Sequence, residues 1–93
     1  MSRRHHFHID YLGHSVSATV QTGHRAVVEI LVDGKETGHT PIKDDGPVTV
    51  PIELPTDPPT AVTVRATQGP GEPSCLLLVA DGGEPREMAH RTY

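Results

Sequence analysis

Apolar and polar residues alternate along most of this chain, which is typical of β-strands with one buried face. The segments 7–11 and 16–20 both follow this pattern, and only a few residues separate them. A two-residue loop at Leu12-Gly13 would pair Ile9 with Val16 and bring the two apolar faces together. The pattern therefore predicts a β-hairpin at the N-terminal end of the chain.

The middle of the chain predicts further antiparallel strands. Residues 26–32 are mostly apolar and end at Asp33-Gly34, a strong signal for a hairpin turn. The return arm, residues 35–37, is short and polar, as suits the edge of a sheet. Residues 48–54 alternate cleanly, but Pro51 has no backbone N–H, so this strand should be an edge strand or carry a bulge.

The last third of the chain predicts two strands and an ambiguous tail. Residues 62–66 alternate, whereas residues 75–80 are apolar on both faces. The tail, residues 86–93, fits either a final strand or one helical turn begun by Pro85. Turn-forming residues separate the strands at positions 43–47, 68–73 and 81–85.

Roughly seven or eight short strands without helices predict an all-β fold. We expect a small antiparallel β-sandwich, immunoglobulin-like in general shape, with a small open β-barrel as the second choice. Residues 1–5 are expected to form a flexible N-terminus, residues 6–85 a single domain, and residues 86–93 a C-terminal strand or tail. The predicted core consists of Val16, Val20, Ile30, Val50, Ile52, Val62, Val64, Leu77 and Val79.

Length and charge exclude several classes of function. The 93 residues are too few for a large catalytic fold. The net charge of −4, with scattered basic residues and 3% aromatic residues, argues against nucleic-acid binding. No apolar stretch approaches the length of a membrane span, and no signal-peptide pattern is seen, so we expect a cytoplasmic protein without membrane association. Abundant Gly, Ala, Arg and Pro indicate a bacterial genome of high GC content.

No catalytic group can be recognised in the pattern. The serines have no evident base, and the carboxylates are scattered singly among the turns, so we expect no enzymatic activity. Cys75 lies in an apolar run and is expected to be a buried small hydrophobic residue.

Closely spaced histidines suggest a metal site as an alternative function. His6 and His8 share one face of the first predicted strand, about 6–7 Å apart. Imidazoles bind zinc, nickel or copper, and His14 is a third candidate ligand. In the predicted hairpin, however, Thr19 and Ser17 lie opposite His6 and His8, and these side chains are poor ligands for such metals. The main expectation is therefore that the protein has no cofactor.

The doubly apolar segment 75–80 carries the leading hypothesis. If Cys75 and Leu77 face the core, Leu76 and Leu78 face outward, and exposed apolar patches usually mark a partner surface. The tail could cover them instead, although Met88 is its only large aliphatic residue. We therefore expect a non-enzymatic protein-interaction or accessory module that binds an unknown protein partner or forms a weak homodimer.

Overall fold

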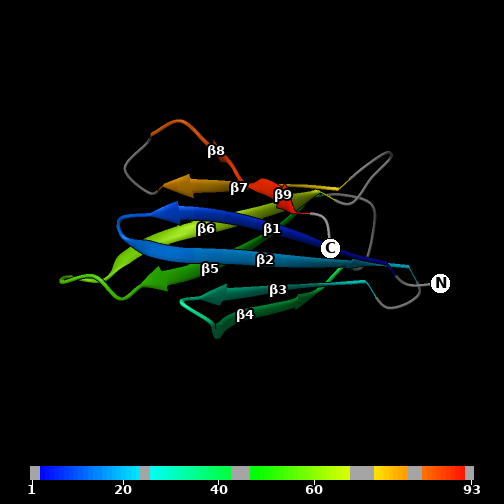
Figure 1. Cartoon of the computed structure of the whole chain (residues 1–93), viewed down its shortest axis with the longest axis horizontal. Coiled ribbons are helices and arrows are strands. Elements are labelled where there is room, and N and C mark those ends of the chain that lie inside the picture. The colour runs from blue at the N-terminus through cyan, green and yellow to red at the C-terminus, as the bar shows by residue number, and fades with distance from the viewer. Residues whose placement is uncertain (1–2, 24–25, 43–46, 68–72, 80–82, 92–93) are drawn as a thin grey trace.

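Two antiparallel β-sheets face each other across one apolar core in a computed structural model of the chain (Figure 1). The structure describes residues 3–23, 26–42, 47–67, 73–79 and 83–91. Its strands are β1 (Arg3–Tyr11), β2 (His14–Thr22), β3 (Val27–Val32), β4 (Lys35–Pro41), β5 (Val48–Leu54), β6 (Thr60–Thr67), β7 (Ser74–Val79), β8 (Arg86–Glu87) and β9 (Ala89–Arg91). The larger sheet has the order β4-β3-β2-β1-β9 and the smaller sheet the order β5-β6-β7-β8. The predicted all-β sandwich is confirmed.

The N-terminal hairpin has the predicted register. Ile9 pairs with Val16, and the turn between β1 and β2 has positive φ at Leu12 (51°) and Gly13 (79°). Positive φ at both central residues matches the right-handed twist of the two strands, which explains why so short a loop suffices. The strand β1 begins at Arg3, so residues 3–5, which we expected outside the domain, pair with β2.

A second tight turn, at Asp33 (φ 52°) and Gly34 (φ 85°), joins β3 to β4 as predicted. The strand β4 lies at the edge of the larger sheet but is longer than the predicted arm, because pairing with β3 continues to Pro41. The register shifts beside Ile30, so Thr37 is an extra residue in β4. The sequence pattern did not predict the full length of β4, because its mostly polar residues show no alternation of apolar and polar positions.

The smaller sheet follows the predicted pattern closely. The strand β5, which contains Pro51, lies at the sheet edge, which is where a residue without a backbone N–H is tolerated. In β7, Cys75 and Leu77 are buried, while Leu76 and Leu78 on the opposite face are only partly buried.

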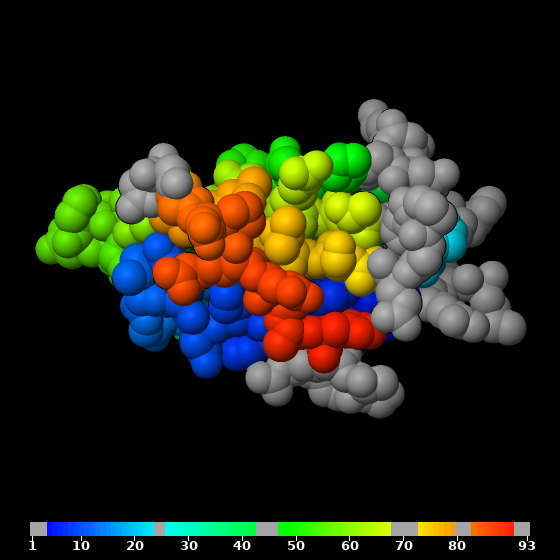
Figure 2. Space-filling view, turned by 90° about the horizontal axis from the view of Figure 1, so that it is seen from above, coloured from blue at the N-terminus to red at the C-terminus, as the bar shows by residue number. Residues whose placement is uncertain are grey.

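The C-terminal segment forms strands rather than a helical turn. The strand β8 pairs with β7 in the smaller sheet, and β9 pairs with β1 in the larger sheet. Figure 2 shows this orange-to-red segment running along the side of the molecule, between β7 and β1. Between the two strands, Met88 enters the core and is only 2% exposed. The segment therefore crosses from one sheet to the other and closes one side of the sandwich.

Eight of the nine predicted core residues are buried; the exception is Val79. Val79, at the end of the described part of β7, is partly exposed. Other residues complete the core: Phe7, Ala18, Val28, Val32, Leu54, Ala66, Cys75 and Met88. Positions 43–46, 68–72 and 81–82 of the predicted turns, and position 80 of the predicted strand 75–80, lie outside the described residues. In the part of the chain that the structure describes, there is no helix that could cross a membrane.

The other side of the sandwich is closed where β4 approaches β5. A Cβ atom added at Gly38 would lie 2.7 Å from Val50 Cγ1 and 3.4 Å from Ile52 Cγ2. Real Cβ atoms do not approach other carbon atoms as closely as 2.7 Å, so Gly38 permits this contact between the edges of the two sheets.

We expect Gly38→Ala to lower the free energy of unfolding by about 1–3 kcal/mol, because the added methyl group overpacks the contact with Val50. Chemical denaturation of Gly38→Ala, Val50→Ala and the double variant measures the coupling. Because Val50→Ala removes the clashing atom, the double variant should lose less stability than the sum of the single variants. Additive losses would show that the contact with Val50 does not limit the approach of β4 to β5.

Candidate functional site

The outer face of the larger sheet carries a row of polar side chains that we call the histidine face: His6, His8, Ser15, Ser17 and Thr19. Nδ1 of His6 is hydrogen-bonded to the Thr19 hydroxyl at 3.2 Å, and Nε2 of His8 to the Ser15 hydroxyl at 2.8 Å. The side chains of β2 are small, so a shallow hollow of about 390 Å³ lies over Ser17 and Thr19, beside Leu31 of β3.

The three predicted metal ligands do not come together. His14 pairs with Tyr11 at the hairpin end, and its position relative to Val16 places it on the core side of the sheet. Its Nδ1 lies 2.7 Å from Oδ2 of Asp33. Among the residues that the structure describes, no three His, Cys, Asp or Glu side chains are placed to hold a metal ion. This placement does not test metal binding itself, so metal binding through His6, His8 and His14 stays a prediction.

A cluster that the sequence did not predict is formed by Ser15, His8 and Asp10. Nε2 of His8 is 2.8 Å from Ser15 Oγ and 3.2 Å from Asp10 Oδ1. In a hydrolase triad, the two ring nitrogens separately face the hydroxyl and the carboxylate. Here one nitrogen faces both groups, and a nitrogen that donates its proton to Asp10 cannot accept one from Ser15. The cluster thus lacks the relay geometry of a serine nucleophile.

Asp33 connects the two turns at the end of the larger sheet. The Ser15 amide donates to Asp33 Oδ1 at 2.9 Å, and the Asp33 amide donates to the Ser15 carbonyl at 2.8 Å. The Ser15 hydrogen bond, and then the bond to His14, hold the pKa of Asp33 below its ordinary value of 3.8. These contacts fix the start of β2 relative to the end of β3, so we assign Asp33 a structural role.

Cys75 is buried in the core, as predicted. Desolvation raises the pKa of its thiol to about 12. The thiol is therefore protonated at neutral pH and is not a nucleophile.

The outer face of the smaller sheet is different in character. We call it the leucine face and define it by Thr63, Arg65, Leu76, Leu78 and Glu87. In the strand register, Leu76 lies between Arg65 of β6 and Glu87 of β8, and Leu78 lies beside Thr63. Met88 does not cover the two leucines, because its side chain is buried in the core. The tail thus closes the sandwich, and Leu76 and Leu78 remain partly exposed on its outside.

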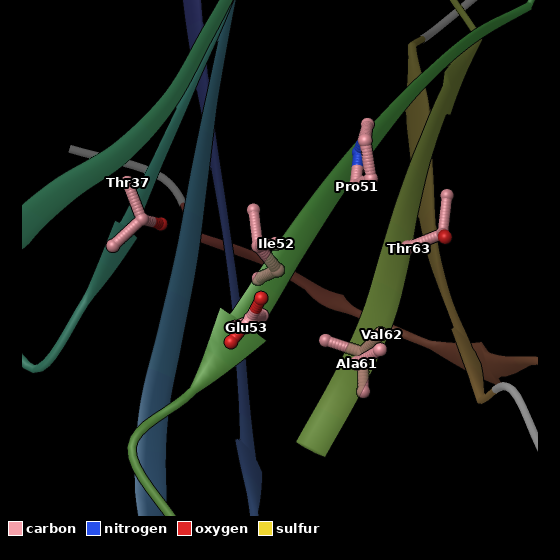
Figure 3. A pocket seen from close by; sticks show the side chains of 7 residues that line it. All are labelled: Thr37, Pro51, Ile52, Glu53, Ala61, Val62 and Thr63. Carbon is pink, nitrogen blue, oxygen red and sulfur yellow. The ribbon is translucent and has the colours of Figure 1, made fainter. Parts of the chain in front are cut away.

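An open groove of about 600 Å³ lies next to the leucine face (Figure 3). Pro51 and Glu53 of β5 and Ala61 and Thr63 of β6 line it, together with Thr37 from the edge of the larger sheet. The sequence pattern did not predict this groove. Small or apolar residues at outward positions of the two strands were a visible signal, but the approach of Thr37 depends on contact between the two sheets.

No family model, curated protein or solved structure matches the chain. The inference of function therefore rests on the geometry and chemistry of the two outer faces.

We expect Asp33→Asn to destabilise the fold at pH 7 and to have a smaller effect in acid. The wild-type carboxylate stabilises the fold above its unfolded pKa, and this contribution is lost as the pH falls through its lowered folded pKa. Asn suits this variant because it accepts a hydrogen bond and tolerates positive φ. Urea unfolding at pH 7, 5, 3 and 2 measures the difference.

Glu84→Gln, at an exposed position outside the strands, is the matched control for loss of one carboxylate. A stability difference between wild type and Asp33→Asn that stays constant from pH 7 to pH 2 would contradict the charged role of Asp33.

Proposed function

We propose that the chain is a non-enzymatic protein-interaction module that binds its partner through the leucine face. The observation that carries this proposal is the pair of outward leucines, Leu76 and Leu78, which are neighbours on the outer face of β7. Both are partly buried by their neighbours, and Met88 of the tail is buried in the core rather than over them.

The composition of the leucine face resembles that of a small interface. An apolar centre with a polar rim is the usual arrangement. Leu76 and Leu78 form the centre, while Thr63, Arg65 and Glu87 surround it. Full burial of a leucine contributes about 1.5–3 kcal/mol, so completing the burial of two leucines supplies part of the energy for a weak complex.

The outer face of the larger sheet has fewer neighbouring apolar side chains, and this difference favours the leucine face as the interaction surface. Its apolar residues, Val27 and Leu31, are separated on β3 by the exposed Glu29. Its other strands contribute mainly histidine and hydroxyl side chains. The leucine face is therefore the more continuous apolar surface of the two.

Site-specific photocrosslinking in living cells tests the proposal even though the partner is unidentified, because the crosslink captures whichever protein lies against the probe. A photoreactive amino acid replaces Thr63 on the leucine face or, as a matched control, Ser17 on the histidine face; both positions are partly buried in central strands. We expect protein adducts from position 63 and few from position 17. The mass of the adduct separates a second copy of the chain from a different protein.

The double substitution Leu76→Thr/Leu78→Thr should abolish the adducts from position 63 while the chain stays folded, because Thr suits an exposed strand position. We expect a loss of about 1–2 kcal/mol in the free energy of unfolding, from the buried part of the two leucines. The matched control is Val27→Thr/Leu31→Thr, which should leave the adducts unchanged. Equal adduct formation from positions 63 and 17, or none from 63, would overturn the proposal.

A further inference from the structure

We infer that the leucine face binds a second copy of the same chain, related to the first by a two-fold axis that runs along β7. This inference rests on the function proposed above and specifies the partner. Three features define it: the order of charges across the face, the absence of other ion pairs to those charges among the described residues, and the small area of the face.

The first feature is one row of side chains across three strands. Arg65 pairs with Leu76, and Leu76 pairs with Glu87, so all three side chains lie on the same face. Neighbouring strands are about 4.8 Å apart, which places the positive and negative positions about 10 Å apart on opposite sides of Leu76. The face therefore has one positive flank and one negative flank.

Rotation about an axis along β7 exchanges these flanks. When two copies meet face to face in this way, Arg65 of one copy lies opposite Glu87 of the other, and the reverse pair forms on the other side. Leu76 and Leu78 then lie over their own equivalents. A two-fold interface of this kind is self-complementary, as homodimers require.

The charges also oppose a second arrangement, in which the two-fold axis lies in the plane of the face but runs across the strands. An axis that runs across the strands through Leu76 would place Arg65 against its own equivalent and Glu87 against its own. Like charges at such contacts oppose binding, so the charge pattern selects the axis along β7.

The second feature is that both charged side chains are available. Arg65 and Glu87 are exposed, and within the described residues neither forms an ion pair.

The third feature is the small area of the interface: only β6, β7 and β8 overlap with the second copy. Such an interface falls at the low end of the size range, below about 1,200 Å² in total, so the dimer is weak and depends on concentration.

Charge reversal tests the inference by sedimentation across a concentration series up to about 1 mM, the weak range in which we expect association. Arg65→Glu gives a face with two negative flanks, and Glu87→Arg gives a face with two positive flanks. Each variant alone should self-associate at least tenfold more weakly than wild type. An equimolar mixture of the two should restore association to within about threefold, because every flank then meets the opposite charge.

Arg4→Glu and Glu29→Arg are the matched controls. They make the same changes in net charge at exposed positions on the other sheet, and both should associate like wild type. A wild type that stays monomeric at the highest concentration would overturn the inference, and so would a mixture that associates no better than its components.

Failure of this inference can be distinguished from failure of the proposed function. If wild type is monomeric but position 63 crosslinks to a different protein, the leucine face remains an interaction surface and only the second copy is excluded. If position 63 yields no adduct of any kind in cells, the proposed function fails, and the sedimentation series alone decides whether a second copy binds the leucine face.

Discussion

The fold depends on one thin apolar layer that two sheets must fill from both sides. Sixteen described hydrophobic residues are buried there; Phe7 is the only aromatic one, and no polar or charged side chain is buried with them. Side chains as small as Val and Ala fill the space only if each strand keeps its register, since a slip of one residue turns its apolar face outward. The tight turns at Leu12-Gly13 and Asp33-Gly34 fix that register in the larger sheet.

The same layer must also be closed at its sides, and the way in which it is closed explains why the two leucines of the leucine face are not covered by Met88. On one side, Gly38 lets β4 approach β5. On the other, the chain crosses from β8 to β9 and places Met88 in the core. Met88 cannot both fill the core and cover Leu76 and Leu78. The outward leucines thus follow from the way in which a small sandwich completes its interior, and they are the residues through which we propose that the smaller sheet associates.

Local patterns predicted the fold well, whereas contacts between distant segments could not be predicted. The hairpin pairing of Ile9 with Val16 follows from alternation and a two-residue loop, and the edge position of β5 follows from Pro51. The burial of Met88 in the core does not follow from a local pattern, because it depends on the space left between the sheets. For the candidate site, the sequence indicated that Leu76 and Leu78 face outward. The row that joins Leu76 to Arg65 and Glu87 requires the register of three strands, and the cluster of Ser15, His8 and Asp10 requires the side-chain positions.

Leu76 and Leu78 lie partly exposed on the outer face of β7, whereas Leu77 and Met88 are buried in the core. Methyl NMR of the dilute protein with a soluble paramagnetic agent measures this directly, because the agent broadens only signals that it can approach. We predict that the methyl signals of Leu76 and Leu78 broaden while those of Leu77 and Met88 stay sharp. Equal protection of all four residues in the dilute monomer would show that the chain covers its own leucines, and a broadened Met88 signal would show that the tail does not close the core.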